Sequence, residues 1–234
     1  MSGPLALVGG DELNPGNEPH DELLVAAAGD GPAFVLATAA TRHRPELAVN
    51  HARNWFSRFG LEVKELPART RTHVKDPAIV QMAAAGRFFY LVGGDPGITV
   101  DLLRGSPLWD AIVGAWRGGA ALAGSSAGAM AMGSWSLIKS RFKGDVERRF
   151  KEALGLVPNV AVVPHFETFG HRWVASAREA RPDAILIGID ERTAAAWDGD
   201  AWRVMGPGSV TVVTPEETTT FDAGGTIEGL PAPG

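Results

Sequence analysis

Residues 119–129 read Gly-Ala-Ala-Leu-Ala-Gly-Ser-Ser-Ala-Gly-Ala, an apolar run that stops at a serine hemmed in by glycine and alanine. This pattern is typical of a nucleophile elbow, a sharp strand-to-helix turn in which only small neighbours fit. Such a turn lifts the hydroxyl of Ser126 above the sheet and directs the following N–H groups at a substrate carbonyl. A tight turn selected for packing alone would give the same pattern, so the rest of the chain has to distinguish the two interpretations.

Apolar runs that end in glycine or small polar residues alternate with helical patterns around this elbow. The runs predicted to be strands are 5–8, 33–37, 61–66, 88–92, 160–163 and 185–189. The segments predicted to be helices are 45–59, 76–85, 100–116 with an interruption at Pro107, the charged stretch 139–154, and 173–181. Continuous apolar strands separated by helices indicate a parallel sheet covered on both faces. We therefore expect an α/β fold, a three-layer sandwich with a mainly parallel central sheet.

The pattern changes to short strands and turns from Thr193 onward. This predicts a C-terminal antiparallel β extension at one edge of the sheet. We expect residues 1–234 to form a single domain, with 214–234 as a peripheral tail and its Gly/Pro-rich end frayed. The exposed edge of the extension is compatible with a homodimer.

The composition is that of an ordinary globular protein, with 45% apolar residues, 21% charged residues and a net charge of −5. The mild acidity argues against nucleic-acid binding, and the basic clusters 69–71 and 139–149 are interpreted as solvated faces, with contact to an acidic substrate as the alternative. Cysteine is absent, which excludes thiolate metal sites and cysteine nucleophiles. Neither a signal peptide nor a membrane-spanning run is apparent, so we expect a cytoplasmic protein.

A serine nucleophile needs a base within hydrogen-bond reach and a third group that orients the base. His165 directly follows the strand 160–163, and Asp190 and Glu191 directly follow the strand 185–189, whereas His20 is expected in a loop. Because parallel strands bind ligands at their carboxyl ends, we expect the serine, the histidine and an acid at the same edge of one sheet. Their order along the chain differs from that of an α/β-hydrolase, whose histidine comes last.

The second requirement is an oxyanion hole for the transition state. The turn Gly93-Gly94-Asp95 follows the strand before the elbow, and glycine there lets the backbone approach a substrate closely. The N–H near Gly94 can then pair with that of Ala127. A turn that only redirects the chain is the alternative interpretation.

Several segments together resemble peptidase family S51, which contains the aspartyl dipeptidases and the cyanophycinases. They are Val-Gly-Gly-Asp at 92–95, Gly-Ser-Ser-Ala-Gly-Ala at 124–129, Pro-His-Phe at 164–166, Gly-Ile-Asp-Glu-Arg-Thr-Ala at 188–194, and Trp-Arg-Val-Met-Gly-Pro-Gly-Ser-Val at 202–210. The resemblance implies a fold like that of the class I glutamine amidotransferases, with serine in place of their cysteine. It also implies Ser126 as nucleophile, His165 as general base and Glu191 as orienting acid, with Asp190 as the alternative acid. Gly94 and Ala127 would supply the oxyanion hole, and no metal or organic cofactor is required.

The chain departs from the cyanophycinase pattern where arginines usually follow the histidine, because Phe169 and His171 stand there. Arg172 is a candidate for binding a substrate carboxylate, and a surface arginine is the alternative. The remaining candidates for substrate contact are Asp95, Ser125 and His171. We expect a serine hydrolase that cleaves small peptides or isopeptides next to an acidic residue, which the resemblance implies is aspartate. An esterase or amidase on the same scaffold, and a silent domain that binds acidic peptides, are the alternatives.

Overall fold

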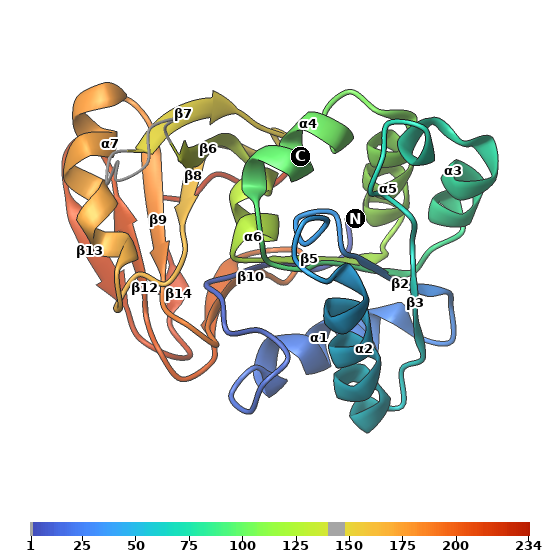
Figure 1. Ribbon diagram of the computed structural model, residues 1–234. Helices are drawn as coiled ribbons and strands as arrows, with labels where there is room; N and C mark the ends of the chain where they lie inside the picture. Colours follow the sequence, from blue (N-terminus) through green and yellow to red (C-terminus); the bar gives the residue numbers. More distant parts are fainter. Residues whose placement is uncertain (1, 140–147) are drawn as a thin grey trace.

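The computed structural model describes residues 2–139 and 148–234, which build two β-sheets and the helices that cover them (Figure 1). Eight strands form the first sheet and six form the second. The fold class expected from the sequence, a mainly parallel α/β sandwich with antiparallel additions, is confirmed. The presence of two sheets was not expected, and it decides how the candidate site is assembled.

The first sheet has a parallel centre and an antiparallel edge. Its strands, in spatial order, are β14 (Thr226–Ile227), β11 (Trp202–Met205), β10 (Ala194–Trp197), β1 (Leu5–Val8), β5 (Ala121–Ser125), β4 (Phe88–Leu91), β2 (Ala33–Leu36) and β3 (Val63–Glu65). Strands β1, β5, β4, β2 and β3 pair in parallel, whereas β10, β11 and β14 pair antiparallel. Four strands of the parallel centre, β1, β2, β4 and β5, are buried along their whole length, because helices cover both faces.

Alternate residues of this sheet enter two separate cores. Ala6 and Val8 pack on one face with side chains of α1 and α2, while Leu5 and Leu7 pack on the other with side chains of α3 and α5. The period of two along each strand makes this division possible. Figure 1 shows the resulting layers, with α1 and α2 below the sheet and α3 and α5 above it.

The second sheet lies beside the first and is also mixed. Its strands, in spatial order, are β13 (Thr218–Phe221), β12 (Val210–Val213), β9 (Ile185–Ile189), β8 (Val157–Val163), β6 (Gly133–Lys139) and β7 (Arg148–Glu152). Strands β6, β8 and β9 run parallel to one another, and the other pairs are antiparallel. The chain enters this sheet directly after the elbow, through the short helix that follows Ser126.

Three helices begin with an aspartate or serine N-cap followed by proline. Asp76, Asp95 and Ser106 each accept a backbone N–H from the first turn of the helix that they precede. The α-helices are α1 (Glu18–Ala28), α2 (Pro45–Phe56), α3 (Pro77–Ala84), α4 (Pro96–Leu103), α5 (Pro107–Arg117), α6 (Ala127–Met132) and α7 (Val174–Ala180). Short 3-10 helices are η1 (Ser57–Phe59), η2 (His73–Lys75) and η3 (Gly170–Trp173).

Two local predictions are wrong. In the described part of the charged stretch 139–154, Lys139 ends β6 and residues 148–152 form β7, which pairs antiparallel with β6 instead of forming a helix; residues 140–147 lie outside the described ranges. Phe150 of β7 contacts Trp135 of β6, so this charged strand is held to its neighbour by an aromatic contact as well as by the backbone pairing. His20 lies in α1 rather than in a loop.

The C-terminal residues are integrated into both sheets instead of trailing from them. Strand β13 pairs with β12 in the second sheet, and β14 pairs with β11 in the first. The end of the chain is held by a bond from the indole N–H of Trp202 to the Pro231 carbonyl (2.9 Å) and from the Gly234 N–H to the Leu156 carbonyl (3.0 Å). Residues 214–234 thus supply one edge strand to each sheet.

Candidate active site

Ser126 occupies the strained turn that the sequence predicts between β5 and α6. Its backbone has φ 48° and ψ −108°, a combination that non-glycine residues rarely adopt. The turn is held by a hydrogen bond from the Ser126 N–H to the Val8 carbonyl (2.9 Å). A side chain at Gly124 would lie 2.6 Å from the carbonyl carbon of Gly128, so the small neighbours are a packing requirement of the elbow.

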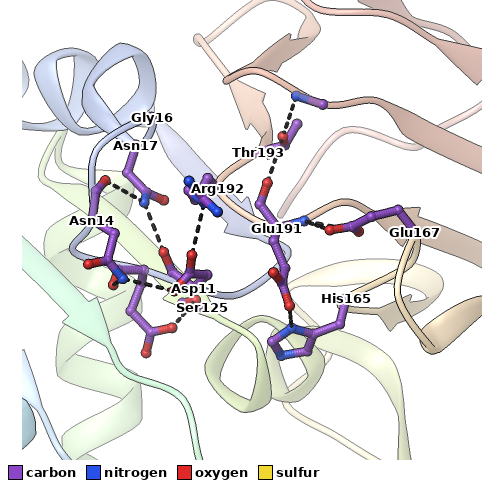
Figure 2. A network of polar contacts seen from close by, with 12 residues as sticks. Asp11, Asn14, Gly16, Asn17, Ser125, His165, Glu167, Glu191, Arg192 and Thr193 are labelled. Carbon is purple, nitrogen blue, oxygen red and sulfur yellow. Dashed lines mark hydrogen bonds and ion pairs between the residues drawn. The ribbon is translucent and has the colours of Figure 1, made fainter.

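The serine, a histidine and an acid form a continuous hydrogen-bonded line. Ser126 Oγ lies 3.1 Å from Nε2 of His165, and Nδ1 of His165 lies 2.7 Å from Oε1 of Glu191. Figure 2 shows the carboxylate of Glu191 reaching the imidazole of His165. In this arrangement Nδ1 donates to the carboxylate, which leaves Nε2 free to accept the serine proton.

These residues come from different sheets, which corrects the expectation of one sheet edge. Ser126 follows β5 of the first sheet, whereas His165 and Glu191 follow β8 and β9 of the second. The loop after β1 joins the two. The Gly9 carbonyl accepts the His165 N–H (2.7 Å) and the Gly10 carbonyl accepts the Arg192 N–H (2.8 Å).

Gly10 packs directly against the imidazole of His165. Its φ of +118° lies in the region that favours glycine, and a Cβ placed on it would lie 2.2 Å from His165 Cε1. The Gly9-Gly10 turn therefore packs against the imidazole of His165 and also connects the two sheets.

Glu191 rather than Asp190 contacts the histidine. The Asp190 carboxylate accepts the backbone N–H (2.9 Å) and the hydroxyl (2.8 Å) of Ser209 instead. Glu167 accepts the Glu191 backbone N–H on both carboxylate oxygens, at 3.0 and 3.1 Å (Figure 2). Burial raises the pKa of Glu167, and the negative charge of Asp190 adds to this effect, although the Glu191 N–H opposes it.

Of the two residues expected to supply an oxyanion hole, one lies near the serine in space and the other follows it directly in sequence. Gly94 lines the same cleft as Ser126, and Ala127 follows it as the first residue of α6. Within the part of the chain that the structure describes, neither backbone N–H has a protein acceptor. Gly94 has φ +142°, and a Cβ there would lie 2.3 Å from the Ala39 carbonyl oxygen, so the turn admits no larger residue.

A cleft of about 740 Å³ opens in front of Ser126 and His165. Five basic side chains line it: Arg42, Lys139, Arg148, Arg149 and Lys151. Both acidic residues of the lining are engaged, since Asp95 caps α4 and Asp101 pairs with Lys151. The cleft therefore presents an excess of positive charge, and the basic cluster 139–149, interpreted from sequence mainly as a solvated face, contributes to it.

Aromatic side chains form one wall of this cleft. Phe169 stacks on the imidazole of His165, with ring centroids 5.0 Å apart and planes at 20°. The guanidinium of Arg148 lies 4.0 Å from the ring centroid of Trp173, which also contacts Phe169. Burial lowers the pKa of Arg148. Phe169, one of the two positions that depart from the cyanophycinase pattern, thus lies at the centre of the site.

The four residues suggested for substrate contact lie in different surroundings. Asp95 lines the cleft, but its carboxylate accepts the N–H groups of Gly97 and Ile98. Ser125 is fully buried behind the elbow. His171 bonds to the Phe166 carbonyl (2.8 Å), and both His171 and Arg172 are exposed outside the cleft lining.

Sequence reasoning missed Glu12, which lies next to Ser125 behind the elbow. The Ser125 hydroxyl donates to one oxygen of its carboxylate (2.8 Å), and the Gly93 N–H donates to the other (2.8 Å). Glu12 follows β1, the strand paired with β5, so its place after a buried parallel strand was the available signal.

A second buried polar group lies beneath α1, away from the cleft. Burial raises the pKa of Asp21 to about 8 and lowers the pKa of His20 to about 4. The Trp55 indole donates to Asp21 (2.7 Å), and Nε2 of His20 lies 3.8 Å from Oδ1 of Asp21. At that separation burial dominates, so both groups are neutral near pH 7 rather than an ion pair. Burial also raises the pKa of Tyr90.

Sequence comparison finds a matching family and several similar proteins. The sequence model of peptidase family S51 matches residues 5–205. The cyanophycinase of Nostoc sp. strain PCC 7120 is 33% identical over 200 residues, which cover 82% of this chain and 67% of that protein. The cyanophycinase of Geminocystis herdmanii is 28% identical over 220 residues, covering 91% of this chain and 80% of that protein.

Solved structures agree with these matches. The crystal structure of a peptidase from an acI-B1 actinobacterium superposes with a TM-score of 0.85 at 32% identity, covering 97% of each chain. A putative peptidase E from Listeria monocytogenes EGD-e, at 17% identity and a TM-score of 0.61 over 95% of this chain and 99% of that chain, shares the fold. Over residues 2–139 and 148–234, no helix has both the length and the apolar character needed to cross a bilayer.

Proposed function

Because this chain belongs to peptidase family S51 and is a serine-type peptidase, we propose that Ser126 attacks the scissile carbonyl of a small peptide or isopeptide. The observation that carries this assignment is the hydrogen-bonded line from Ser126 Oγ through His165 to Glu191, at 3.1 and 2.7 Å. The first distance lies within the range in which a base can take the proton of its nucleophile, and the second lies within hydrogen-bond range of the acid that orients the base.

In the first step Nε2 of His165 accepts the proton of Ser126 while Oγ forms a bond to the carbonyl carbon. Glu191 holds the imidazole in the tautomer that carries a proton on Nδ1 and stabilises the imidazolium that forms. His165 then donates its new proton to the leaving amine as the carbon–nitrogen bond breaks, which leaves an acyl-enzyme. Water deprotonated by His165 hydrolyses the ester and regenerates the serine.

The negative charge that develops on the carbonyl oxygen needs donors that are already in place. The N–H groups of Gly94 and Ala127 are assigned this role, since Gly94 lines the cleft with Ser126, Ala127 directly follows Ser126, and neither N–H has a protein acceptor in the described ranges. Removing one such donor in serine peptidases costs roughly 10²–10³ in kcat.

An acidic residue next to the cleaved bond is the substrate feature that the cleft favours. Its lining carries five basic side chains, and the two acidic ones are engaged within the protein. Arg148, whose guanidinium lies over Trp173, is the side chain best suited to a carboxylate, because an arginine fork can bind both oxygens. His171 and Arg172 have no part in this proposal.

Hydrolysis of a dipeptide panel tests the proposal. The panel contains α-Asp-X, β-Asp-X, Glu-X and neutral X-X dipeptides, and released amine is followed with wild type, Ser126→Ala and Ser57→Ala, an exposed serine far along the chain from the elbow. We expect cleavage confined to the acidic set, lost in Ser126→Ala and unchanged in Ser57→Ala.

Other outcomes have equally definite meanings. Cleavage that survives Ser126→Ala would refute the assigned nucleophile, and equal turnover of neutral dipeptides would refute the preference for an acidic residue. Turnover of simple esters without turnover of any dipeptide would favour an esterase on this scaffold. The cytoplasmic location and the homodimer remain predictions, for cell fractionation and light scattering respectively.

A further inference from the structure

Glu12 bridges two loops that meet behind the nucleophile. One carboxylate oxygen accepts the Gly93 N–H and the other accepts the Ser125 hydroxyl, both at 2.8 Å. Gly93 immediately precedes Gly94, and Ser125 immediately precedes Ser126. The carboxylate therefore contacts the backbone of one loop and a buried side chain of the other, 81 and 113 residues away along the chain.

The loop that carries Glu12 is itself fixed by polar contacts. Asp11 pairs with Arg192 (2.8 Å), and Asn14 donates to the Asp11 carboxylate (2.8 Å). The buried Asn17 donates to the Asp11 carbonyl (3.0 Å) (Figure 2). With the residues on both sides of Glu12 held in the left-handed region, at φ 51° and 61°, the carboxylate has a defined position.

We propose that Glu12 is a positioning residue that sets the separation between the Gly94 and Ala127 N–H groups. It does not line the cleft and does not touch the nucleophile oxygen, so it acts through Gly93 and Ser125. Hydrogen bonds to a carboxylate are shorter and stronger than neutral ones, which suits a clamp between two loops. A shift of about 1 Å in catalytic geometry can lower the rate roughly 100-fold.

This inference rests on the proposed peptidase reaction, and its test separates the two. Wild type, Glu12→Ala, Glu12→Gln and the control Glu22→Ala, an exposed glutamate of α1, are compared on the cleaved dipeptide. A peptidyl boronic acid, which forms a tetrahedral adduct with a serine nucleophile, and the product peptide serve as the two ligands. Thermal unfolding of each variant is recorded in parallel.

We expect Glu12→Ala to lower kcat about 10- to 100-fold with KM changed less than about twofold. Its affinity for the boronic acid should fall by the same factor while its affinity for the product is kept. Glu12→Gln should recover most of kcat, because its amide oxygen can accept the Gly93 N–H while its amide nitrogen donates to the Ser125 hydroxyl. Glu22→Ala should equal wild type.

Wild-type kcat in Glu12→Ala would overturn the inference, as would equal weakening of both ligands. Where Glu12→Ala fails to fold, Ser125→Ala decides, because it removes one arm of the bridge: an unchanged kcat overturns the inference and a several-fold lower kcat at constant KM supports it. Failure of wild type to cleave any dipeptide would instead refute the proposed function.

Discussion

Replacement of Gly10 by alanine should inactivate the enzyme by displacing its histidine. The new methyl carbon would lie 2.2 Å from Cε1 of His165, whereas ordinary contact between such atoms begins near 3.4 Å. The imidazole must therefore retreat by about 1.2 Å, because the backbone on the other side of the contact is held by the Arg192 N–H bond to the Gly10 carbonyl.

A displacement of that size breaks both bonds of the histidine. The 3.1 Å contact from Ser126 Oγ to Nε2 lengthens beyond hydrogen-bond range, and the 2.7 Å contact to Glu191 is distorted. Loss of general-base catalysis costs about 10²–10⁴ in rate, so we expect kcat/KM to fall at least 100-fold, equivalent to about 2.7 kcal/mol of activation free energy. A second effect is backbone strain, since alanine at φ +118° costs about 1–3 kcal/mol of folding stability.

A matched variant separates these two effects. Gly199 has φ +106° and open space around its Cβ position, so Gly199→Ala carries similar strain without the collision. Both variants should melt at a temperature lower by roughly 2–12 °C, but only Gly10→Ala should lose activity. Hydrolysis of the preferred dipeptide and the rate of labelling by a fluorophosphonate, which reports the reactivity of Ser126, measure activity independently.

Wild-type labelling and turnover in folded Gly10→Ala would refute the assignment of Gly10 as the support of His165. An equal loss of activity in Gly199→Ala would show that strain and not the collision is responsible.

Three further predictions concern the surroundings of the site and the buried acid. Glu167→Ala should lower kcat about tenfold, with a smaller loss in Glu167→Gln, because the Glu191 N–H loses its acceptor; steady-state kinetics check this, and equal kcat in all three proteins would contradict it. Because burial raises the folded-state pKa of Asp21 to about 8, its contribution to stability is complete below about pH 4 and is lost as the pH rises to about 8. Burial lowers the pKa of His20 to about 4, so His20 has the opposite effect on the pH dependence of stability, but only below its unfolded-state pKa of 6.5. Asp21→Asn should therefore gain stability over wild type by a margin that grows from pH 6.5 to 8, and thermal scans with a constant margin would contradict this. Arg148→Met should raise KM for acidic dipeptides about tenfold at unchanged kcat, whereas a lower kcat at unchanged KM would show that only packing on Trp173 was lost.

The sequence contained enough to identify the elbow and the ends of the strands. Ser126, His165 and Glu191 each follow a continuous apolar run, and such runs are recognisable without tertiary information. The sequence could not show whether Asp190 or Glu191 contacts His165. The answer depends on Ser209, which lies in another strand connection and donates its hydroxyl to Asp190.

The division into two sheets could not be predicted either. Strand β5 and residues 160–163 of β8 are both fully buried, so no local pattern tells which neighbours each will pair with. The prediction of a helix before β8 failed for a related reason, since charges at Arg148, Arg149 and Lys151 suit an exposed helix face as well as a strand that borders a charged cleft. Gly10 and Glu12 belong to a turn whose partners lie more than 80 residues away.

The hydroxyl of Ser126 and the imidazole of His165 are anchored to separate sheets, with the Gly9-Gly10 turn as the bridge between them. A fluctuation that parts the sheets by about an ångström leaves both strand ladders intact, so circular dichroism does not register it. In the proposed reaction the same fluctuation would stop proton transfer, because the hydroxyl of Ser126 would lie outside hydrogen-bond reach of His165. The rate of turnover therefore reports on the contact between the two sheets. On heating, the enzyme should lose activity at a temperature at which its secondary structure is still intact.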